Sequence, residues 1–97
     1  MFEERRLRST SRRLQRARED LAVADEQLAQ LADESGDAEI RALVSDDPSA
    51  GLESVDASRH RDAMARHRQD LLDTIARLEA TQDELLDELT AKRAAGR

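Results

Sequence analysis

Leucines recur at every seventh position in the N-terminal part of the chain, and small or apolar residues follow them three positions later. These positions are Leu7, Leu14, Leu21 and Leu28, followed by Thr10, Ala17, Ala24 and Leu31. Four successive heptads of this kind predict one α-helix with a seam along one face. Because residues 2–34 contain no Gly or Pro, we expect the helix to cover this segment and to stop at Gly36.

A second heptad pattern occupies the C-terminal part of the chain. It consists of Met64, Leu71, Leu78 and Leu85, with Arg68, Ile75, Gln82 and Leu89 in the alternate layer. The pattern continues without a helix breaker as far as Gly96. It therefore predicts a second helix over about residues 56–95.

The segment between the two seams, residues 35–56, has the composition of a connecting tip. Gly36 and Gly51 interrupt it, and residues 46–49 read Asp-Asp-Pro-Ser, which is typical of a turn. Asp37 is a suitable N-cap for a short helix within this tip. Several apolar residues of the segment lie outside both seams, and we expect them to cap the end of the molecule: Ile40, Leu43, Val44, Leu52 and Val55.

Charged residues are arranged in blocks of alternating sign. Residues 1–18 carry seven arginines against two glutamates, and residues 19–56 carry twelve acids against Arg41. Residues 57–68 are basic again, and residues 69–90 are acidic. Antiparallel helices would place each basic block beside an acidic one, whereas parallel helices would set like charges together.

These patterns predict an all-α fold, an antiparallel two-helix coiled-coil hairpin with a short helical and acidic tip. The whole chain, residues 1–97, is expected to form this single domain. In the predicted register Leu14 faces Leu78, Thr10 faces Gln82 and Ala17 faces Ile75. A polar layer thus meets a polar layer and a small residue meets a large one.

Two leucines of the second helix do not fit its seam. Leu72 and Leu86 lie beside it and widen the apolar stripe beyond what one neighbouring helix covers. A chain of 97 residues also buries a small fraction of its surface. Both features favour association, either with a second copy as a four-helix bundle or with a partner protein. The expected interface residues are Leu72, Ile75, Leu86 and Leu89.

Composition removes several classes of function. The chain has no Cys, and Phe2 is its only aromatic residue, whereas 39% of its residues are charged. It contains no glycine-rich phosphate loop and no catalytic triad, so we expect neither enzymatic activity nor a cofactor. His60 and His67 share a helical face, but no carboxylate lies three residues before either one, as a di-iron bundle would require.

The longest uninterrupted apolar run has four residues, Leu21 to Ala24, which is too short to cross a bilayer. We therefore expect a cytoplasmic protein without membrane contact. Arginine outnumbers lysine fifteen to one, which is typical of a GC-rich bacterial genome.

The acidic tip is the first candidate for chemistry, through Asp37, Glu39, Asp46 and Asp47. A long hairpin that carries acids at its end resembles, in architecture, the secondary-channel factors of bacterial RNA polymerase. That resemblance, which no sequence motif accompanies, implies a regulator that inserts carboxylates near a catalytic magnesium ion. The alternative interpretation is a solvated acidic loop.

The arginine-rich start of the chain is the second candidate. Arg5, Arg8, Arg12 and Arg16 could contact phosphates of a nucleic acid. The alternative interpretation pairs these arginines with the acidic second helix. A net charge of −6 and the lack of stacking aromatics argue against nucleic acid as a partner.

The leading hypothesis from sequence is a non-enzymatic helical hairpin that acts as a protein-interaction module. Such a scaffold, adaptor or regulatory subunit would associate with itself as a homodimer or dock on a larger protein complex. Tip insertion into an enzyme such as RNA polymerase is the second hypothesis, and nucleic-acid binding is the third.

Overall fold

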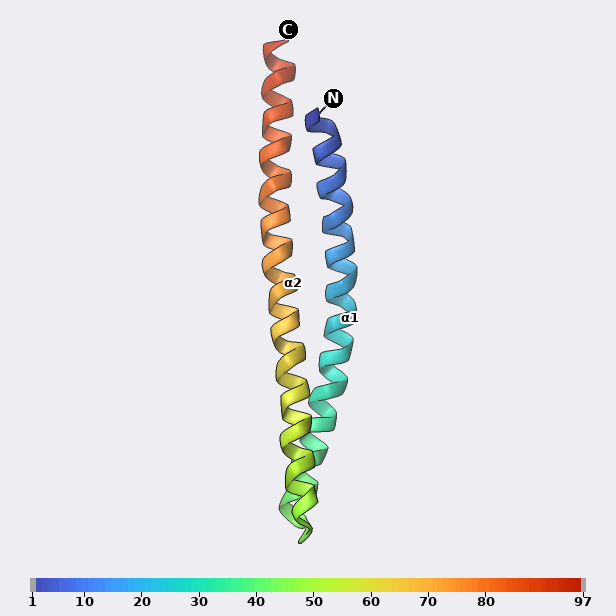
Figure 1. Cartoon of the computed structure of the whole chain (residues 1–97). Coiled ribbons are helices and arrows are strands. Elements are labelled where there is room, and N and C mark those ends of the chain that lie inside the picture. Colours follow the sequence, from blue (N-terminus) through green and yellow to red (C-terminus); the bar gives the residue numbers. More distant parts are fainter. Residues whose placement is uncertain (1, 97) are drawn as a thin grey trace. The chain divides into compact units, whose positions relative to one another are not determined.

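The computed structural model describes residues 2–96, and within that range it consists of two α-helices and no strand (Figure 1). Helix α1 spans Phe2–Val44 and helix α2 spans Pro48–Ala95. Together they make 96% of the structure helical. The two helices form an antiparallel hairpin, as the seams and charge blocks predict.

The helix bounds differ from those expected at the tip. Helix α1 does not stop at Gly36, and the separate tip helix expected after Asp37 is the continuation of α1. Gly36 has no positive φ, so it adopts ordinary helical geometry. Its neighbours Ser35 and Ala38 are 1% and 2% exposed. Packing of that face against α2 outweighs the cost of one glycine, because tertiary contacts supply most helical stability.

The connection between the helices is a turn of three residues, Ser45 to Asp47, and not a tip of residues 35–56. Pro48 is the first residue of α2, a position where proline loses no helical hydrogen bond and its fixed φ suits the helix. Asp47 caps this helix: its Oδ1 accepts a hydrogen bond from the Ser49 N–H at 3.0 Å. Hydrogen bonding from Ser49 lowers the pKa of the Asp47 carboxyl below its ordinary value, because it stabilises the carboxylate.

The chain divides into two compact units, each containing part of both helices. Unit 1 combines Met1–Asp20 with Leu71–Arg97, and unit 2 comprises Leu21–Asp70. Because each unit contains segments of α1 and α2 that run in opposite directions, the core of each can be described by itself.

Large side chains fill the core of unit 1. Leu14 and Leu85 are each 1% exposed, and Ile75, Leu78 and Leu89 are also buried. Polar contacts between the helices follow the predicted register: the Gln82 side-chain amide donates to Ser11 Oγ at 3.1 Å. At the chain ends Lys92 Nζ pairs with the Glu3 carboxylate, which lowers the pKa of Glu3.

Small side chains fill the core of unit 2. Its buried residues are Ala24, Ser35, Ala38 and Ala50. The hydroxyl oxygens of Ser35 and Ser58 are 3.2 Å apart, and Arg61 donates to Ser35 Oγ at 3.2 Å. Because a serine side chain is short, this distance requires the two helix backbones to approach closely. Farther from the turn, Arg68 pairs with Asp25.

All sixteen positions of the two predicted heptad seams are buried or half-buried, in both units. The coiled-coil prediction is therefore confirmed at the level of individual positions. Pairing of α2 with a second hairpin, the four-helix bundle of the sequence analysis, stays a prediction.

Replacing Gly36 by alanine is expected to stabilise the protein by about 0.5–1 kcal/mol, because alanine restricts the unfolded chain more than glycine does. A Cβ atom at Gly36 would have no neighbour within 4 Å, and the same holds for Gly51. Urea denaturation followed by circular dichroism measures the change. As a control, Ala29→Gly at an exposed position of α1 should lower stability by a similar amount. A Gly36→Ala protein that is less stable than the wild type would contradict the observation that a Cβ atom at this position has no close neighbour.

Candidate functional site

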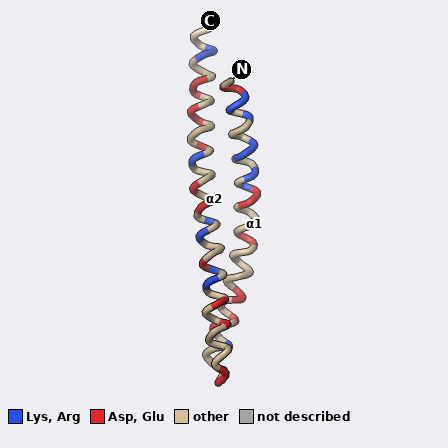
Figure 2. Tube along the Cα trace, in the orientation of Figure 1, with Lys and Arg blue, Asp and Glu red and all other residues tan. Residues whose placement is uncertain are grey.

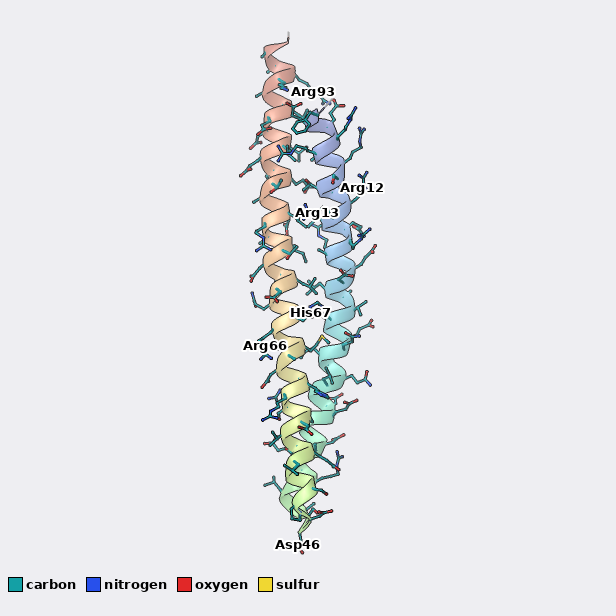
Figure 3. All side chains as sticks on the ribbon, in the orientation of Figure 1. Arg12, Arg13, Asp46, Arg66, His67 and Arg93 are labelled. Atoms are coloured by element: carbon teal, nitrogen blue, oxygen red, sulfur yellow. The ribbon has the colours of Figure 1, made fainter. Side chains whose placement is uncertain are left out.

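The four acids expected to act together at the tip do not gather at one point. Asp37 and Glu39 lie on α1, where their side chains are exposed. Asp46 projects from the turn (Figure 3), and Asp47 is engaged in capping α2. A site that delivers several carboxylates to one metal ion would need them side by side.

Metal-binding chemistry has no preassembled site in the part of the chain that the structure describes. There, no three side chains of His, Cys, Asp or Glu lie together as ligands. His60 and His67 are both exposed. Both flank Met64, a seam residue that is half-buried.

The apolar residues expected to cap the end of the hairpin do not do so. Leu43 and Val44 are 81% and 80% exposed. They belong to a group of exposed apolar side chains on both sides of the turn, which we call the tip apolar set: Ile40, Leu43, Val44, Leu52 and Val55. The correction has a physical reason, since the small residues Ala38 and Ala50 occupy the inner positions next to the turn and the large side chains project from the other faces of the helices.

The seven arginines near the start of α1 are all exposed. None of the ion pairs found among residues 2–96 involves them, so the expected pairing with acids of α2 does not occur. Their spacing explains this result. Arg5, Arg12 and Arg16 share the face of α1 opposite the buried Leu14, whereas Arg8 lies toward the flank of the helix. Arg12 points away from α2 in Figure 3. Arg6 lies over the Phe2 ring, 5.8 Å from its centroid.

Unit 1 therefore carries opposite charges on its two helices, as Figure 2 shows by the basic α1 segment and the acidic α2 segment. The exposed acids of α2 in this unit include Glu79, Asp83, Glu84, Asp87 and Glu88. Within the described part of this unit, the ion pair between the helices joins Lys92 to Glu3, and none joins an arginine of the basic segment to these five acids.

The expected interface residues separate into two groups. Ile75 and Leu89 are each 8% exposed and belong to the core between the two helices of unit 1. Leu72 is half-buried, and Leu86 is 46% exposed. Of these four residues, only Leu72 and Leu86 leave apolar surface exposed to another protein.

Residues 2–96 include no helical stretch with both the length and the apolar character that crossing a bilayer requires. No protein-family model, no curated protein and no solved structure matches this chain.

Proposed function

We propose that the protein is a non-enzymatic protein-interaction module that pairs with a second copy of itself along unit 1. The observation that carries this proposal is the surface of α2 in that unit. Leu72, Glu79 and Leu86 are seven residues apart, so they share a face beside the buried seam. Leu86 remains 46% exposed there, although large apolar residues along a helical stripe are normally covered.

Charge supports a second copy as the occupant of this face. In a two-fold symmetric pair, any contact of α1 with α2 of the other copy occurs twice. The basic α1 segment and the acidic α2 segment of unit 1 would then attract each other at both places. Since no ion pair found among residues 2–96 uses these arginines, their charges are available for such contacts.

A charge-swap experiment tests this pairing. One variant carries Arg8→Glu and Arg18→Glu, and the other carries Glu79→Lys and Asp83→Lys; all four side chains are exposed. Each variant alone would bring like charges together twice and should sediment as a monomer, whereas the wild type sediments as a dimer. An equimolar mixture should again form dimers, because both contacts regain opposite charges.

Two further measurements make the outcome decisive. Circular dichroism must show that each variant keeps the helical content of the wild type. The variant Leu72→Lys/Leu86→Lys should also be monomeric, and no charge-swapped mixture should rescue it. A wild type that stays monomeric at high micromolar concentration, or a mixture of folded variants that stays monomeric, would refute the proposed pairing.

Polyanion binding is a second candidate function, favoured by the exposure of all seven arginines. It predicts that labelled duplex DNA binds the wild type with an affinity that falls steeply with salt. The variant Arg12→Glu/Arg16→Glu changes the face opposite the seam, so it should abolish DNA binding and leave a dimer intact. Fluorescence anisotropy and sedimentation of this variant distinguish the two functions.

A further inference from the structure

The tip apolar set contains most of the exposed large apolar side chains among the residues that the structure describes. The structure exposes eight large apolar residues among residues 2–96, and five of them lie between positions 40 and 55. On α1, Ile40, Leu43 and Val44 have the spacing of one helical face, and Leu52 and Val55 have it on α2. Because Ala38 and Ala50 face the other helix, the α1 group and Leu52 lie on different outer sides near the turn. Single exposed apolar residues are common, but the three on one helical face of α1 indicate a contact surface.

These side chains are held outward by the core of unit 2. Ala38 and Ala50, only 2% and 9% exposed, occupy the inner positions near the turn. The close approach at Ser35 and Ser58 leaves no space between the helices for a leucine. The cap formed by Asp47 and the three-residue turn fix the start of α2. The apolar side chains therefore project from helix ends whose positions are fixed by a short, hydrogen-bonded turn.

The surroundings of the set are strongly acidic. Residues 37–56 carry six acids against Arg41, and all six acids are exposed. Beside Val44 lies an open hollow at the junction of the helices, and Asp47 and Glu53 are among its lining residues. The tip thus combines an apolar centre, the exposed face of α1 with Ile40, Leu43 and Val44, with a negative rim.

We propose that this tip, residues 37–56, docks on a protein partner that presents apolar side chains flanked by lysines or arginines. Charge selects this occupant. A second tip would bring two negative rims together, and nucleic acids and anionic lipid surfaces would be repelled in the same way. A basic amphipathic segment satisfies both the apolar centre and the acidic rim. This surface is separate from the proposed self-association along unit 1 and does not depend on it.

Model peptides test the two chemical requirements separately. The probes are a fluorescent amphipathic helical peptide of Leu and Lys, a matched peptide with Glu in place of Lys, and one with Ser in place of Leu. Fluorescence anisotropy should show binding of the Leu/Lys peptide alone. The variant Ile40→Gln/Leu43→Gln should weaken this binding by about tenfold or more, because two large apolar contacts on the same face of α1 are lost.

Two variants serve as the charge test and the control. Asp46→Asn/Glu53→Gln should weaken binding and reduce its dependence on salt, while sparing Asp47, which caps α2. Val23→Gln replaces another exposed apolar residue of unit 2 that lies outside the tip, so it should leave the affinity unchanged. Equal affinities of the tip variants and Val23→Gln would overturn the proposal, as would binding of the Leu/Glu peptide.

The partner in the cell is identified by photo-crosslinking from position 43 in the native host. We expect adducts with one protein segment that contains apolar residues between lysines or arginines. Crosslinks to a second copy, to lipid or to nucleic acid would each overturn the proposal, as would the absence of any adduct. The Leu72→Lys/Leu86→Lys variant should give the same peptide affinity and adduct as the wild type, so failure of self-association can be distinguished from failure of the tip.

Discussion

Replacing Leu85 by alanine is expected to lower the free energy of unfolding by about 2–5 kcal/mol, enough to unfold much of the protein at room temperature. Leu85 is 1% exposed in the core of unit 1, and its truncation would remove apolar contacts and leave a cavity. A two-helix core has few other large side chains to move into the space. Chemical denaturation monitored by circular dichroism gives the change in free energy.

Leu52→Ala is the matched control, because it makes the same truncation at a leucine that is 68% exposed. We expect this control to change stability by less than about 0.5 kcal/mol, as surface substitutions normally do. Both proteins must be compared where the unfolding midpoint no longer depends on concentration, so that association does not contribute. Similar losses for the two variants would mean that the core of unit 1 is not at Leu85.

Replacing Ala38 by a larger residue should destabilise unit 2, as truncation of Leu85 should destabilise unit 1. Ala38 is 2% exposed where the helices approach closely, so the variant Ala38→Leu has to push them apart. Overpacking of this kind costs about 1–3 kcal/mol. It should also separate Ser35 from Ser58, whose hydroxyls are 3.2 Å apart in the wild type.

The control for this change is Ala32→Leu on the exposed side of α1. Leucine is a good helix former, so this variant should be as stable as the wild type. Thermal unfolding followed by circular dichroism compares the two. An Ala38→Leu protein as stable as Ala32→Leu would show that the helices of unit 2 have space between them.

The two helices and their antiparallel order could be predicted because heptad periodicity and charge blocks are properties of the sequence alone. The predicted pair Thr10 and Gln82 lies one residue from the observed hydrogen bond between Gln82 and Ser11. Leu14 and Leu85, predicted as seam positions, are the most deeply buried leucines.

The tip could not be predicted in the same way. Glycine and proline normally interrupt helices, so Gly36 and Pro48 suggested an irregular segment. Neither residue acts in that way here. Tertiary packing of Ser35 and Ala38 carries α1 through Gly36, and Pro48 occupies the one helical turn that tolerates it. To predict that α1 continues through Gly36, one would need to know which of its small residues face α2.

The candidate surfaces were only partly visible in the sequence. Leu72 and Leu86 stood outside the seam and do retain exposed surface. The exposure of Leu43 and Leu52 was not foreseen, although their position on the face opposite Ala38 and Ala50 is a usable signal. Small residues at inner positions with leucines directly outside them indicate helices that pack closely and leave their large side chains in solvent.

The short turn also sets the order in which the chain can close. Ser35 and Ser58 are separated by 23 positions, Ser11 and Gln82 by 71, and Glu3 and Lys92 by 89. The entropy cost of closing a loop rises with its length, so contacts beside the turn form at the lowest cost and those at the chain ends at the highest. Pairing can then spread residue by residue away from Asp47, and loosening can begin at Glu3 and Lys92. The apolar side chains around the turn thus belong to the segment whose order depends least on the remainder of the chain.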